Sequence, residues 1–138
     1  MFDWLDYLTL ARALVAHDQP AGASAESRLR CAASRAYYAV LNRAAGHLRD
    51  VGEDLPKDAS YHDAVIDHFR ECREHEWRRV GDWLEKLREN RRKADYEEQE
   101  GNWSKKAEKS LVLSHQAIQA LEAGIESLRQ VFGDPDSA

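Results

Sequence analysis

Apolar residues recur every three to four positions along almost the entire chain, and this period constrains the fold more than any other feature. Such spacing places the apolar side chains on one face of an α-helix. No stretch alternates polar and apolar residues between hairpin turns, as a surface strand would. The three prolines lie in polar stretches and mark loops. We predict five helices, at about 2–17, 24–50, 60–73, 75–98 and 104–132. The second carries the clearest stripe: Leu29, Ala33, Ala36, Val40, Ala44 and Leu48.

The chain length and the spacing of these helices favour one unit. A chain of 138 residues suits a single domain, and short connections favour antiparallel neighbours. The predicted fold is all-α, an up-and-down bundle of four to five antiparallel helices over residues 1–133, with a flexible tail at 134–138. Ser24 and Ser104 are the predicted N-caps of the second and fifth helices. Gly81 could kink the fourth helix, whose boundary with the third is weakly marked.

Composition and motifs exclude several function classes. The formal net charge of −5 at pH 7 argues against non-specific coating of DNA. No apolar run approaches the ~18 residues of a membrane span, and two cysteines make no disulfide framework. The acidic N-terminus does not resemble a signal peptide, so we expect a cytoplasmic protein that does not enter a membrane. Because no P-loop, Rossmann glycine pattern or HExxH motif occurs, an ordinary hydrolase is unsupported, and we expect no cofactor.

One arginine breaks the apolar stripe of the predicted fourth helix. Arg91 falls on that stripe, within the segment KLRENRRK at 86–93, which holds five basic residues. A guanidinium at such a position must be paired or must border a cleft. Asp95 lies one turn later, at the spacing that lets carboxylate and guanidinium meet, and Arg92 and Tyr96 flank the pair. The segment therefore predicts an ion pair, an anion or phosphate site, or both.

Two adjacent tyrosines lie in the middle of the predicted second helix. One of Tyr37 and Tyr38 must face the core, and an ideal helix puts Tyr37 nearer to it. A buried tyrosine hydroxyl needs a hydrogen-bond partner. Core packing is the simpler interpretation of both rings. Arg35 lies off the main stripe and could reach a groove.

A run of potential metal ligands lies near the weak boundary between the third and fourth helices. His68, Glu71, Cys72 and His75 follow the spacing i, i+3, i+4, i+7, which puts them on one face of a continuous helix. Such faces also arise by accident, and His68 and Cys72 fit the apolar stripe as packing residues. We therefore predict packing here and no metal site.

Three segments, in order, resemble one known family. SRAYYAVLNRA at 34–44, YHDAVIDHF at 61–69 and LRENRRKADYEE at 87–98 are similar to segments of HEPN domains, particularly those of the small UPF0332-like group. The resemblance implies a four-to-five-helix bundle that is often a homodimer. Many HEPN proteins are metal-independent ribonucleases. They act as toxins, frequently beside a nucleotidyltransferase-type antitoxin, or in defence systems.

The resemblance also assigns candidate residues. The catalytic candidates are Arg91, Asp95 and Tyr96, and the candidates for binding RNA or phosphate are Arg92, Lys93, Arg88, Arg35 and Tyr38. The usual family signature has a histidine four to six residues after the arginine. No histidine follows Arg88, Arg91 or Arg92 at that spacing, and the matches from Arg12 to His17 and from Arg70 to His75 lie outside the corresponding helix.

Two functions follow as hypotheses. The first is a HEPN-like toxin or defence component that acts on or binds RNA, as a metal-independent ribonuclease with a degenerate catalytic motif. The alternative is a non-catalytic module that binds a nucleotidyltransferase-type partner or a nucleotide. A third, less favoured hypothesis is a metal-dependent site on the face from His68 to His75.

Overall fold

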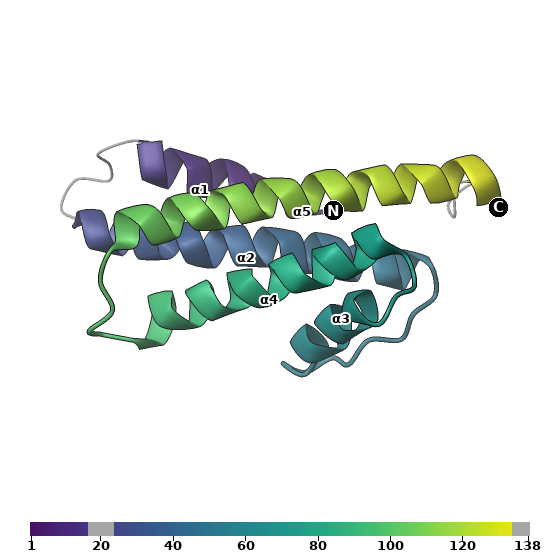
Figure 1. Ribbon diagram of the computed structural model, residues 1–138, viewed down its shortest axis with the longest axis horizontal. Helices are drawn as coiled ribbons and strands as arrows, with labels where there is room; N and C mark the ends of the chain where they lie inside the picture. Colours follow the sequence, from purple (N-terminus) through teal and green to yellow (C-terminus); the bar gives the residue numbers. More distant parts are fainter. Residues whose placement is uncertain (17–23, 134–138) are drawn as a thin grey trace.

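The computed structural model describes residues 1–16 and 24–133, and in this part of the chain every regular element is a helix. The helices are α1 (Asp6–Ala16), α2 (Ala25–Asp50), α3 (Tyr61–Arg70), α4 (His75–Tyr96) and α5 (Trp103–Phe132) (Figure 1). The all-α prediction is confirmed. The predicted tail at 134–138 lies outside the described residues. None of the helices described here is long and apolar enough to cross a membrane.

Helices α1, α2, α4 and α5 form the bundle, and α3 packs at its side. In Figure 1 the chain direction alternates from α1 to α2, to α4 and to α5, so that helices consecutive in the bundle run antiparallel. α2 contacts α1, α4 and α5, while the short α3 packs mainly on α4. This arrangement brings the start of α3 and the end of α4 beside the middle of α2.

The core follows the stripe predicted for α2. Ala33, Ala36, Val40, Ala44 and Leu48 are all buried. The small alanine side chains let neighbouring helices approach α2 closely. The core also contains larger side chains from the other helices, including Ile66, Phe69, Leu84, Leu87 and Leu121.

The helix ends agree only in part with the prediction. The Ser24 side chain accepts a hydrogen bond from the Ser27 amide at 3.1 Å and caps α2, as predicted. α5 begins one residue earlier than predicted, because Asn102, with φ of 65°, is its N-cap residue and not Ser104. The first helix begins at Asp6 and the third ends at Arg70, so both are shorter than predicted.

Gly81 has a packing role and does not interrupt α4, which continues to Tyr96. A Cβ atom at Gly81 would lie 2.5 Å from Cγ and 2.7 Å from the backbone nitrogen of Arg70. Real Cβ atoms do not approach other atoms so closely. The glycine therefore lets the end of α3 lie directly against α4.

Candidate functional site

Three helices meet around the side chain of Tyr38, in the middle of α2. Nη2 of Arg91, from α4, donates a hydrogen bond to the Tyr38 hydroxyl at 2.5 Å. The ring of His62, from the start of α3, packs edge-on against the Tyr38 ring with the centroids 5.8 Å apart. We call Tyr38, His62 and Arg91 the Tyr38 site.

Arg91 is held by its own helix as well as by Tyr38. Its Nε lies 3.0 Å from Oδ2 of Asp95, one turn later, so the predicted ion pair is confirmed. Ser34 of α2 donates to the same carboxylate oxygen at 3.4 Å. Nη1 of Arg91 makes no hydrogen bond to the residues that the structure describes. A planar guanidinium that is fixed on one side and free at Nη1 is suited to bind a phosphate oxygen.

Guanidinium groups and aromatic rings alternate through the site. The Arg35 guanidinium carbon lies 4.8 Å from the Tyr7 ring centroid and 5.2 Å from that of Tyr38. The Arg91 carbon lies 5.2 Å from the Tyr38 centroid and 5.5 Å from that of Tyr96. These distances are in the cation–π range. Because Tyr96 is 74% exposed, its ring is open to stacking with a nucleic-acid base.

His62 is fixed by the core and lies near the arginines of the C-terminal half of α4. Its Nδ1 lies 2.8 Å from the hydroxyl oxygen of Tyr37. Tyr37 is fully buried, and burial raises the pKa of its hydroxyl, so this group stays protonated. Burial, and then Arg91 and Arg88, hold the pKa of His62 below its usual value of 6.5. Its imidazole is therefore neutral at pH 7, and Nε2 makes no hydrogen bond to any described residue.

Arg88 joins α4 to α3. Its Nη1 donates to Oδ1 of Asp63 at 2.5 Å, and its Nη2 donates to Oε2 of Glu85 at 2.6 Å. The two carboxylates share its charge, and its side chain is only 12% exposed. Arg88 thus holds the start of α3, with His62, beside α4; its predicted role in binding RNA stays a prediction.

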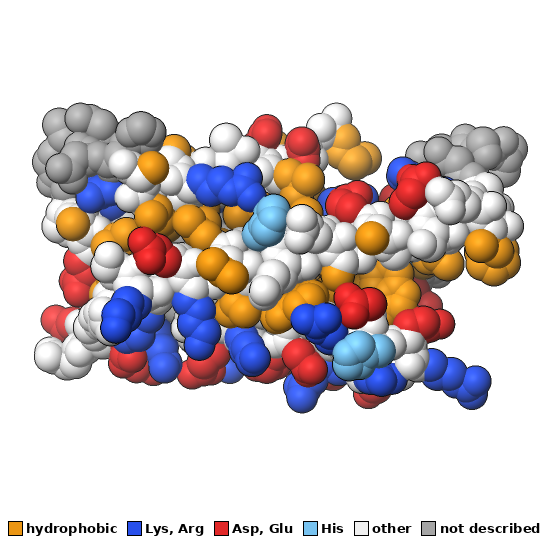
Figure 2. Space-filling view, turned by 45° about the horizontal axis from the view of Figure 1, so that its top comes forward, with side chains coloured by type: hydrophobic (Ala, Val, Ile, Leu, Met, Phe, Trp, Pro, Cys, Tyr) orange, Lys and Arg blue, Asp and Glu red, His pale blue; other side chains and the backbone are white. Residues whose placement is uncertain are grey.

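The other predicted basic residues lie along the end of α4. Arg92 is exposed and makes no ion pair within the described residues, whereas Lys93 lies 3.7 Å from Glu100 in the connection to α5. Basic and acidic side chains alternate along the lower edge of the molecule in Figure 2. The surface there has mixed charge, so the unpaired charge of Arg92 is a local feature.

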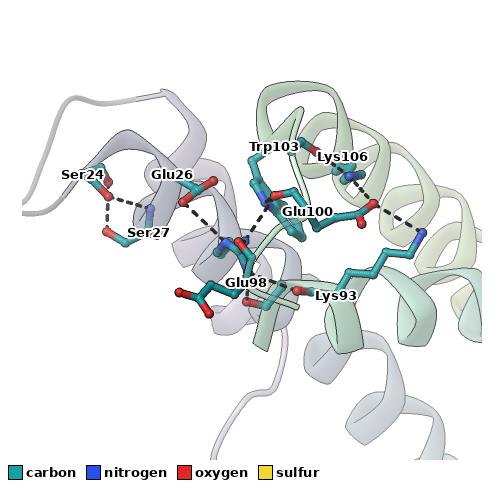
Figure 3. Close-up of polar contacts among 11 residues, drawn as sticks. Ser24, Glu26, Ser27, Lys93, Glu98, Glu100, Trp103 and Lys106 are labelled. Atoms are coloured by element: carbon teal, nitrogen blue, oxygen red, sulfur yellow. Dashed lines mark hydrogen bonds and ion pairs between the residues drawn. The ribbon is translucent and has the colours of Figure 1, made fainter. Parts of the chain in front are cut away.

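Arg30 of α2 positions the end of α4. Its guanidinium donates to the carbonyl oxygens of Lys93 and Ala94, and to those of Glu98 and Glu100, at 3.0 to 3.3 Å. It also lies 4.7 Å from the Trp103 ring centroid. Figure 3 shows Glu98, Glu100 and Trp103 gathered at this connection. One of these bonds satisfies the Ala94 carbonyl, which the end of α4 leaves unpaired. The others tie α2 to the connection after α4, and together they fix the turn that carries Asp95 and Tyr96.

The four potential metal ligands do not share a helix face. α3 ends at Arg70 and α4 begins at His75, so the helical spacing from His68 to His75 is interrupted. No group of three or more His, Cys, Asp or Glu side chains in the described part of the chain is arranged to hold a metal ion. The interpretation as a single ligating face is therefore wrong, because the chain reverses direction between residues 71 and 74.

Two other arginines are followed by a histidine at the spacing of the family signature, Arg12 by His17 and Arg70 by His75. Of these residues, His17 lies outside the described part of the chain.

Most residues of this site are predicted from the sequence, except His62 with its bond to Tyr37, and Arg30. Tyr37 is the buried member of the tyrosine pair and Tyr38 is half-buried, as the helix phase predicted. His62 lies within YHDAVIDHF, the segment that resembles the His-containing start of the third helix in HEPN domains. That segment was the one signal that could have identified it.

Comparisons with family models, with curated proteins and with solved structures find no match to this chain. The geometry of the site therefore carries the functional argument, beside the resemblance of the three sequence segments.

Proposed function

We propose that the protein is a HEPN-like ribonuclease that cleaves single-stranded RNA without a metal ion, with Arg91 and His62 as its catalytic residues. The observation that carries this proposal is the meeting of these two side chains at Tyr38. They come from different helices, and a phosphate that contacts Arg91 would therefore lie near an imidazole that is neutral at pH 7.

The proposed reaction uses the RNA's own 2′-hydroxyl as the nucleophile. In the tautomer with a proton on Nδ1, that nitrogen donates to the Tyr37 oxygen and Nε2 has a free lone pair. Nε2 accepts the 2′-hydroxyl proton while the 2′-oxygen attacks phosphorus. The bond from phosphorus to the 5′-oxygen breaks, this oxygen takes a proton from water, and the imidazolium of His62 returns its proton to the hydroxide so formed. The products are a 2′,3′-cyclic phosphate and a 5′-hydroxyl, and Nη1 of Arg91 stabilises the charge on the phosphoryl oxygens.

The surrounding residues support binding of a single strand. Tyr96 offers an exposed ring to a base, and Arg92 offers an exposed charge to the backbone. Arg35 and Asp95 hold Tyr38 and Arg91 in place rather than contact the reacting atoms. Asp95 and Tyr96 were predicted as catalytic residues; in this proposal the first positions Arg91 and the second binds RNA.

A cleavage assay tests the proposal. Labelled single-stranded RNA and tRNA are incubated in EDTA with the wild type, with Arg91→Ala and with Arg12→Ala, an exposed arginine on α1 that serves as the matched control. We expect cleavage by the wild type and the control, loss of cleavage in Arg91→Ala with unchanged helical content, and a cyclic phosphate product. An RNA with a 2′-deoxy group at the cleaved position should resist. Cleavage of that substrate, or full activity of Arg91→Ala, would refute the proposed chemistry.

The ion pair of Arg91 with Asp95 favours a second candidate function, a non-catalytic module that binds RNA, a nucleotide or a nucleotidyltransferase-type partner. A carboxylate already compensates the Arg91 charge there. RNA that binds without being cleaved would support this candidate over the first.

The three sequence segments further lead us to propose a homodimeric toxin or defence component beside a nucleotidyltransferase-type antitoxin. Sedimentation of the purified protein tests the dimer.

A further inference from the structure

A cavity of about 440 Å³ lies at the other end of the bundle, between the ends of α2 and α5 and the connection from α3 to α4. It shares no residue with the Tyr38 site. Its volume is within the range of small-molecule sites. Hydrophobic side chains gather beside the C-terminal half of α5 in Figure 2. The apolar lining consists mainly of Leu48, Phe69, Trp77, Ile125, Leu128 and Phe132.

One polar side chain in this lining is almost fully buried and makes no hydrogen bond within the described residues. His47 is 7% exposed and lines the cavity, and its ring nitrogens make no hydrogen bond to any described residue. Its ring stacks in parallel on Trp77, with the centroids 5.7 Å apart and an angle of 10° between the planes. These nitrogens are not among the side-chain atoms that are sealed from solvent without a partner, so a molecule in the cavity can reach them. His47 is therefore a hydrogen-bonding group held in a fixed orientation at the cavity wall.

The charged side chains around the cavity restrict the net charge of a ligand that could bind there. Nε and Nη2 of Arg43 donate to the Glu122 carboxylate at 2.7 and 3.1 Å, so this guanidinium is already paired. The remaining charged lining residues are the base Arg129 and the acids Asp50, Glu53 and Glu74. Burial and the Arg43 charge lower the pKa of His47, so its ring is neutral at pH 7. Because acids outnumber bases, an anionic ligand is disfavoured.

We propose that this cavity binds a small neutral molecule that is largely apolar, carries a flat ring and pairs one hydrogen-bonding group with His47. Such a ligand packs against the apolar walls and hydrogen-bonds the accessible imidazole of His47. The proposal does not depend on the ribonuclease activity, because the cavity and the Tyr38 site have no lining residue in common.

The probe for the test is N-phenyl-1-naphthylamine, which is neutral, aromatic and has a single N–H donor. Its fluorescence is titrated against the wild type, Leu128→Trp, His47→Phe and Val112→Trp. Leu128→Trp fills the cavity, His47→Phe keeps a ring on Trp77 but removes both nitrogens, and Val112 is an exposed α5 residue that serves as the control. We expect saturable binding by the wild type and the control, at least tenfold weaker binding by Leu128→Trp, and about 3- to 10-fold weaker binding by His47→Phe.

A second measurement does not depend on the folding of any variant. Nuclear Overhauser contacts between the probe and the rings of Trp77 and His47 are expected in the wild-type protein. Absence of saturable binding to the wild type, or contacts only to other aromatic rings, would overturn the proposal. Equal affinity of wild type and a folded Leu128→Trp would overturn it as well, as would a wild-type dimer that closes this face and excludes the probe.

Discussion

Gly81→Ala is expected to destabilise the protein, although alanine is the better helix former. In an open helix position the change stabilises by about 0.5–1 kcal/mol. At Gly81, however, the new Cβ would lie 2.5 Å from Arg70 Cγ and 2.7 Å from the Arg70 backbone nitrogen. The end of α3 must therefore move by about 1 Å or more, and such overpacking costs about 1–3 kcal/mol. Because the obstacle includes backbone, we expect the upper end of that range and a net loss of about 2 kcal/mol.

Urea denaturation followed by circular dichroism measures this effect. With an m-value of about 2 kcal/mol/M, the midpoint of Gly81→Ala should fall by about 1 M. Gly46→Ala is the matched control, because Gly46 also lies within a helix but a Cβ there meets nothing within 4 Å. Its midpoint should stay the same or rise. A Gly81→Ala variant as stable as Gly46→Ala would refute the packing of α3 against α4 and, with it, the placement of His62.

Three further predictions concern the caps and the titrating groups. Arg30→Ala should lower the free energy of unfolding by about 1–3 kcal/mol in urea denaturation, because the carbonyl oxygens of Ala94 and Glu98 lose their donor; an unchanged midpoint would contradict the cap. His47 has a pKa below 6.5 in the folded chain, so the unfolded chain binds more protons, and stability should fall below about pH 6.5 by at most ~1.4 kcal/mol per pH unit. Denaturation at several pH values should show a smaller fall in His47→Phe. The rate of RNA cleavage should rise with pH as His62 loses its proton, with the midpoint of the rise below pH 6.5; a rate that first rises above pH 7 would contradict a neutral imidazole base.

The features that the sequence predicts well are those set within a single helix. The stripe of α2, the burial of Tyr37 ahead of Tyr38 and the pairing of Arg91 with Asp95 all follow from the 3.6-residue period. His62 and Arg30 depend instead on contacts between segments that are distant in sequence, for which the period gives no information. The end of α3 at Arg70 was also missed, since residues 71–74 contain neither proline nor glycine. The break before residue 75 was predicted, but the earlier end of α3 depends on the close approach of Arg70 to Gly81 on the next helix.

The most direct test of the account is the rate at which His62→Ala cleaves single-stranded RNA in EDTA under single-turnover conditions. His115→Ala is the matched control, because His115 is exposed on α5. The account predicts that the wild type and His115→Ala cleave at the same rate, and that His62→Ala is slower by about 10²–10⁴, with its helical content unchanged. A wild type that leaves RNA intact, or a His62→Ala variant that cleaves as fast as the wild type, would contradict the proposed pairing of His62 with Arg91 in catalysis.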